Sequence, residues 1–96
     1  MECDYIKLDF NAESMLDGLR RWVLCESPSY DPNAVNRMQA IAAHDLAVLG
    51  ASVETIAPHP AVGICIRARF PHSANDRPGI LILGHMDTVH PIGTLE

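Results

Sequence analysis

The sequence predicts an α/β fold in which two N-terminal helices precede three strands. Up to Gly50, apolar residues recur every three or four positions, which is typical of helices that bury one face. After Gly50 the spacing changes to alternation and then to an unbroken apolar run, both of which are typical of strands. The 96 residues are enough for one small domain with a core.

The first helix is predicted from about Ala12 to Cys25. Asn11 is a good N-cap, and Glu13 complements the helix dipole in the first turn. The proline of Ser27-Pro28-Ser29 ends the helical region, because a residue before proline is disfavoured in the α conformation. We expect one apolar stripe of this helix to belong to the core, namely Met15, Leu16, Leu19, Trp22 and Val23.

The second helix is predicted between Asp31 and Gly50. Asp31 suits the N-cap, Pro32 suits the first helical position and Gly50 suits the C′ position. The apolar stripe of this helix consists of Val35, Met38, Ala42, Leu46 and Leu49. His44 lies off the stripe, so we interpret it as a solvated residue.

Three strands are expected to follow. Ser52–Ile56 predicts a short strand, and alternation over Val62–Phe70 predicts a half-buried one, so that the two could pair as a hairpin. Residues Pro71–Gly79 are rich in turn formers and are expected to be exposed. The continuous apolar run Ile80–Leu83 predicts a third strand that is buried on both faces.

Composition excludes several classes of function. Twelve acidic residues against seven basic ones give a net charge of −5, which argues against nucleic acid as a partner. No apolar run approaches the roughly 20 residues of a membrane span, and the N-terminus lacks the pattern of a signal peptide. Cys3, Cys25 and Cys65 indicate no disulfide framework, and we interpret the last two as buried free thiols of a cytoplasmic protein.

The residues that point to chemistry follow the third predicted strand, in Gly84-His85-Met86-Asp87. Side chains two positions apart on a strand share a face, and ligands bind at the carboxyl ends of strands in open α/β sheets. A neutral imidazole is a good zinc ligand, and a nearby carboxylate can orient it. The pattern His-x-Asp is expected on the order of 0.3 times by chance in such a chain, so a structural histidine is the competing interpretation. His90 is interpreted as a loop histidine.

Residues Ile80–Leu95 (ILILGHMDTVHPIGTL) resemble the first metal-ligand segment of the zinc-dependent amide hydrolases. This family includes glutamate carboxypeptidase, aminoacylase, acetylornithine deacetylase and succinyl-diaminopimelate desuccinylase. The tail from His90 to Leu95 most resembles the glutamate carboxypeptidase branch, and Ser27-Pro28-Ser29 is similar to a segment after the family's first helix. The resemblance implies that His85 binds one of two zinc ions and that Asp87 is the supporting catalytic carboxylate. A zinc-bound water would then attack the amide of a small peptide or N-acyl amino acid.

The family's other metal ligands and its glutamate base have no counterpart in residues 1–96. The resemblance therefore implies that 1–96 is the N-terminal portion of a metallopeptidase catalytic domain without its dimerisation domain. We expect this piece to be inactive alone, and to be marginally stable or to assemble, for example as a homo-oligomer. Two alternatives stay open. One is a non-enzymatic α/β remnant or interaction module, and the other is a deacetylase or desuccinylase of the same family.

Overall fold

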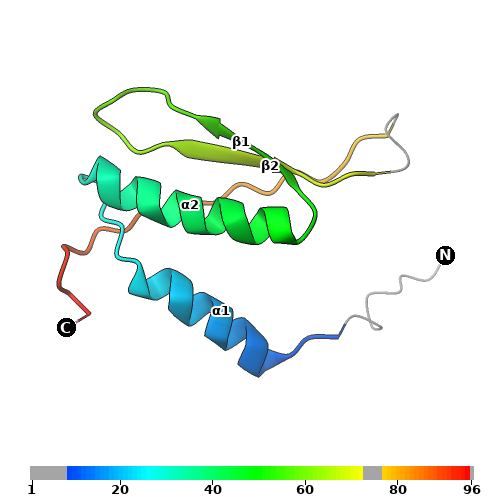
Figure 1. Cartoon of the computed structure of the whole chain (residues 1–96), viewed down its shortest axis with the longest axis horizontal. Coiled ribbons are helices and arrows are strands. Elements are labelled where there is room, and N and C mark those ends of the chain that lie inside the picture. Colours follow the sequence, from blue (N-terminus) through cyan, green and yellow to red (C-terminus); the bar gives the residue numbers. More distant parts are fainter. Residues whose placement is uncertain (1–8, 73–76, 96) are drawn as a thin grey trace.

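The computed structural model describes residues 9–72 and 77–95. This part of the chain contains two helices, α1 (Ala12–Leu24) and α2 (Pro32–Val48), and a hairpin of β1 (Ser52–Ile56) and β2 (Cys65–Arg69). The mixed α/β class is therefore confirmed. Helix α2 contacts both strands and α1, so that it lies between the hairpin and α1 (Figure 1). Three predictions concern residues outside the described ones, at least in part. They are the predictions for Cys3, for the N-terminal signal pattern and for the turn-rich segment 71–79.

Local capping sets the ends of both helices, as predicted. The Oδ1 atom of Asn11 accepts a hydrogen bond from the Ser14 amide at 3.1 Å, and Asp31 Oδ1 accepts one from the Ala34 amide at 3.1 Å. Each bond satisfies one of the amides that a helix leaves unpaired at its start. Gly50, with φ of 105°, ends α2 in the left-handed region, where glycine carries no steric penalty.

The structure confirms the hairpin of two strands that the sequence predicts, although β2 is shorter than the predicted Val62–Phe70. The strands are antiparallel, in a register that runs from Ser52 opposite Arg69 to Ile56 opposite Cys65. Glu54 faces Arg67, whose Nε donates a hydrogen bond to the carboxylate. This bond lowers the pKa of Glu54 below its usual range.

Among the described residues, the buried hydrophobic side chains all lie on α2 and are Ala34, Val35, Met38 and Ala42. The α2 stripe is thus confirmed in its first half, whereas Leu49 at its end is 72% exposed. Cys65 is exposed rather than buried, because it belongs to the outward face of β2. Near the start of α2, Asn36 Oδ1 accepts a hydrogen bond from the Ile64 amide at 2.8 Å. This bond connects α2 to the residue just before β2.

The prediction that the α1 stripe belongs to the core is wrong for this structure. Met15, Leu16, Leu19 and Val23 are between 52% and 61% exposed, and α1 has no buried residue. The physical reason is that α1 contacts α2 but neither strand within the described residues. An amphipathic pattern predicts which face of a helix can be buried, and another element must then cover that face.

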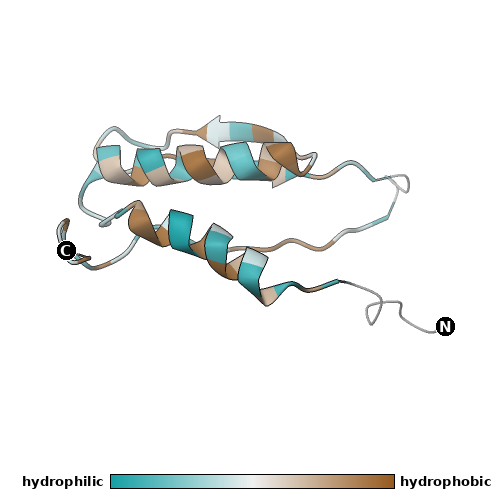
Figure 2. Ribbon diagram, turned by 60° about the horizontal axis from the view of Figure 1, so that its bottom comes forward, coloured by the Kyte–Doolittle hydropathy of each residue, from teal (hydrophilic) through white to brown (hydrophobic). Residues whose placement is uncertain are grey.

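The third strand is also absent from the described residues. Ile80–Leu83 forms no ladder, and its four side chains are between 80% and 93% exposed. The hydrophobic stretch that leads toward the C-terminus runs apart from the hairpin in Figure 2. An apolar run is buried on both faces only where strands flank it and helices cover it. Within the described residues, no strand pairs with Ile80–Leu83 and no helix covers it.

Candidate functional site

Residues Glu26–Ser29, here called the anchor segment, run beside the Met86–Thr88 part of the predicted motif. A parallel bridge pairs Pro28 with Thr88. The Ser29 amide donates to the Thr88 carbonyl at 2.9 Å, and the Thr88 amide donates to the Ser27 carbonyl at 2.9 Å. Residues about sixty positions apart are therefore held in register by backbone hydrogen bonds.

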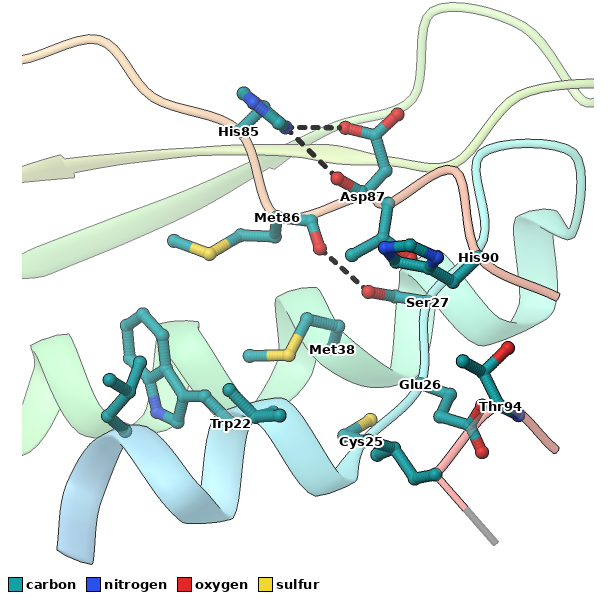
Figure 3. Close-up of a pocket in the computed structure, with 14 residues that line it drawn as sticks. Trp22, Cys25, Glu26, Ser27, Met38, His85, Met86, Asp87, His90 and Thr94 are labelled. Carbon is teal, nitrogen blue, oxygen red and sulfur yellow. Dashed lines mark hydrogen bonds and ion pairs between the residues drawn. The ribbon is translucent and has the colours of Figure 1, made fainter. Parts of the chain in front are cut away.

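The middle of the anchor segment, Ser27 and Pro28, is buried. Ser27 is 2% exposed, and Pro28 is among the most buried side chains of the described residues. The Ser27 hydroxyl donates a hydrogen bond to the Met86 carbonyl at 2.7 Å, which satisfies a polar group that would otherwise be buried without a partner (Figure 3). The segment that follows α1 thus serves as a fixed edge for the motif.

The structure brings His85 and Asp87 together, although the strand from which their shared face was predicted is absent from the described residues. The Nδ1 atom of His85 lies 3.0 Å from the Asp87 carbonyl oxygen and 3.2 Å from Asp87 Oδ1 (Figure 3). A carbonyl oxygen can only accept, so this geometry places the proton on Nδ1 when the ring is neutral. The lone pair then lies on Nε2, and the imidazole side chain is 83% exposed. This arrangement is typical of a histidine that binds a metal through Nε2.

A second partner holds the Asp87 carboxylate from the other side. The Ser29 hydroxyl donates to Asp87 Oδ2 at 2.5 Å. This hydrogen bond, followed by smaller contributions from the Asp87 backbone and from His85, lowers the pKa of Asp87 below its usual range. Asp87 is therefore an anion at neutral pH, and an anion is the stronger acceptor for an imidazole N–H.

Glu26 anchors the turn after the motif. Its carboxylate accepts hydrogen bonds from the Gly93 amide, at 2.9 and 3.1 Å to the two oxygens, and from the Thr94 amide at 3.1 Å. Gly93 has φ of 97°, which turns successive amides toward one point. The Thr94 hydroxyl closes the turn by donating to the Pro91 carbonyl at 2.6 Å. The anchor segment thus holds both the motif and its tail.

A cavity of about 320 Å³ lies between the C-terminal half of α1, Met38 of α2 and the segment that carries the motif (Figure 3). Its polar rim includes His85, Asp87 and His90. Its walls are mainly apolar and include Leu19, Trp22, Val23, Met38, Met86 and Leu95. The exposed stripe of α1 therefore forms part of the wall of a cavity that reaches the motif.

The structure places both predicted site residues in one cluster and adds three that sequence reasoning did not assign to the site. The sequence indicates Ser27-Pro28-Ser29 only as the end of the first helix and as a segment similar to one of the zinc-dependent amide hydrolases, and it indicates no role for Glu26. Their contacts with the motif span 58 to 68 positions of sequence, and no spacing rule predicts such contacts. Within residues 9–72 and 77–95, no three His, Cys, Asp or Glu side chains gather as a metal site would require.

Comparison of the chain with protein-family models, curated proteins and solved structures gives no match. No helix in the described part of the chain is long and apolar enough to cross a membrane.

Proposed function

We propose that this chain is the N-terminal part of the catalytic domain of a zinc-dependent amide hydrolase, of the kind that includes glutamate carboxypeptidase. One observation carries the proposal. The Nδ1 atom of His85 faces two acceptors from Asp87, which leaves Nε2 exposed and available. A structural histidine at a strand end has no need of this arrangement, whereas a metal ligand does.

The residues present fit one position of a metal site. His85 would hold zinc through Nε2, and Asp87 would fix the ring and its tautomer. When bound, zinc supplies a Lewis acid that polarises a carbonyl and lowers the pKa of a bound water. The further ligands and the general base of the proposed enzyme would come from residues outside the described cluster. The substrate would be a small peptide, such as one with a C-terminal glutamate, or an N-acyl amino acid.

Two exposed apolar surfaces support the idea that this chain belongs to a larger catalytic domain. Ile80–Leu83 has the composition of a buried central strand, yet its side chains are 80–93% exposed. The α1 stripe has the pattern of a core helix, and all of its residues except Trp22 are more than half exposed. Solvated apolar area of this kind is typical of surfaces that other elements cover. In the proposed enzyme, Ile80–Leu83 is the third strand of the sheet.

Metal binding tests the role of His85. The 96-residue chain should bind zinc weakly, because one imidazole cannot replace a full ligand set, and His85→Ala should abolish that binding. The measurement is isothermal titration with zinc, with His44→Ala as the control because His44 is an exposed imidazole on α2. Micromolar zinc binding that survives His85→Ala would contradict the assignment.

The reading frame beyond Glu96 tests the enzyme class. A downstream acidic ligand, an adjacent pair of glutamates and a late histidine in the same frame would support the hydrolase. An authentic stop codon would favour the non-enzymatic α/β remnant or interaction module. If the longer chain exists, its activity on glutamyl, acetyl and succinyl amides separates a carboxypeptidase from a deacetylase or desuccinylase.

A further inference from the structure

We propose that Ser29 is a positioning residue for His85 and acts through the carboxylate of Asp87. The proposal goes beyond the function proposed above, and it rests on that function only in treating His85 as a metal ligand. The hydrogen bonds form a chain from the Ser29 hydroxyl to Asp87 Oδ2, and from Asp87 Oδ1 to His85 Nδ1 (Figure 3 shows the second contact).

The Ser29 hydroxyl has one proton and two acceptors within reach. Asp87 Oδ2 lies at 2.5 Å and the Thr88 carbonyl oxygen at 3.1 Å. A carboxylate is the stronger acceptor and the distance is shorter, so the proton goes to Asp87. One carboxylate oxygen is then fixed by Ser29, which leaves the other directed at the imidazole.

Asp87 is exposed enough to rotate without this bond. Its side chain retains 39% of its accessible surface, and that of His85 retains 83%, so packing alone does not fix either group. The Asp87 carbonyl oxygen also accepts from His85 Nδ1, at 3.0 Å. If the carboxylate moved away, this second acceptor would still favour the Nδ1–H tautomer of His85 in part. Loss of the Ser29 hydroxyl should therefore reduce the preference without abolishing it.

A substitution of the Ser29 side chain should leave the backbone contact between the anchor segment and the motif intact. The bridge between Pro28 and Thr88 uses only backbone atoms, and it includes the amide of Ser29 itself. Ser29 is exposed, so that alanine leaves no cavity and threonine has room for its methyl group. Ser27 provides the matched control, because its hydroxyl binds the Met86 carbonyl and does not reach Asp87.

The test is the tautomer of His85, read from the ¹⁵N shifts of its two ring nitrogens in the metal-free 96-residue chain at pH of about 8.5, above the ordinary range of imidazole pKa values. We expect Ser29→Ala to lower the ratio of the Nδ1–H to the Nε2–H tautomer about fivefold, as loss of one hydrogen bond implies. Ser29→Thr should restore the ratio, and Ser27→Ala, which removes a contact to Met86 but none to the Asp87 carboxylate, should lower it less than Ser29→Ala does. Amide spectra of α2 and the hairpin show whether each variant is folded.

Three outcomes would overturn the proposal. They are an unchanged ratio in Ser29→Ala, an equal fall in Ser27→Ala, and a ratio in Ser29→Thr as low as that in Ser29→Ala. The experiment uses no metal, so its failure is distinguishable from failure of the proposed hydrolase function, which the zinc titration and the longer reading frame test.

Discussion

Trp22 and Asp45 connect the two helices through a hydrogen bond from the indole Nε1 to Asp45 Oδ2, at 2.7 Å. Arg21 donates to the same oxygen and forms an ion pair with it. The bond from Trp22, with a further contribution from Arg21, lowers the pKa of Asp45 below its usual range. Because α1 has no buried residue, these polar contacts matter more for its position than they would for a core helix.

The first prediction follows from the lowered pKa of Asp45. A carboxyl with a lower pKa in the folded state stabilises the fold at pH values above its unfolded pKa, near 3.8, and this contribution disappears as the pH falls through the folded pKa. Asp45→Asn should therefore lower the melting temperature at neutral pH and reduce its decline below a pH of about 5. Thermal unfolding across pH measures both effects. The control is Asp17→Asn on α1, and equal pH profiles for the two variants would contradict the prediction.

The second prediction concerns the core. Met38 is 3% exposed on α2, whereas Met15 is 61% exposed on α1. Met38→Ala should cost about 2–3 kcal/mol of unfolding free energy, at the low end for buried methionine, because Met38 already borders the cavity. Met15→Ala should cost less than about 0.5 kcal/mol, as is usual for surface sites. Urea unfolding measures both changes, and similar costs would show that α1 is covered in solution.

The third prediction concerns Gly63, which packs against α2. A Cβ at this position would lie 2.3 Å from Val35 Cγ1 and 2.6 Å from Val35 Cβ. Val35 is buried and cannot move aside freely, so Gly63→Ala should destabilise the fold by about 1–3 kcal/mol. Gly79→Ala is the control, because nothing lies within 4 Å of its Cβ. In the double variant with Val35→Ala the two costs should be less than additive, and full additivity would contradict the clash.

The fourth prediction concerns Glu26. Glu26→Ala removes the carboxylate that accepts from the Gly93 and Thr94 amides, so hydrogen exchange should accelerate about tenfold or more at Gly93. The acceleration should be smaller at Thr94, because its amide also donates to the Pro91 carbonyl at 3.3 Å. Exchange at the hairpin amides should stay unchanged. Glu54→Ala, which removes a carboxylate from the hairpin, should leave the Gly93 and Thr94 amides as protected as before. The prediction would be contradicted if these amides exchanged at the same rate in the unaltered chain, in Glu26→Ala and in Glu54→Ala, because the turn would then not depend on the Glu26 carboxylate.

Features encoded within a few residues were predictable. Asn11 and Asp31 bond to amides three positions away, so the helix starts follow from local sequence. Alternation over 62–70 predicted the hairpin for a similar reason, because side-chain direction in a strand follows from neighbouring positions. His85 and Asp87, two residues apart, belong to this class, and the structure places them in contact.

Features that depend on a distant partner were not predictable. The α1 stripe and Ile80–Leu83 have the patterns of buried elements, and both are exposed where the described residues give them no cover. The anchor segment shows the opposite case, since Glu26, Ser27 and Ser29 gained roles that no local pattern indicated.

The sequence by itself determined the caps, the periodicities and the proximity of His85 to Asp87, because each depends on groups only a few residues apart. Only the tertiary structure decided which apolar faces are covered and which side chains hold the motif in place. The physical reason is that burial and long-range hydrogen bonds depend on which segments meet in space. The parallel bridge of Pro28 with Thr88 is such a meeting, and it connects Ser29 to Asp87.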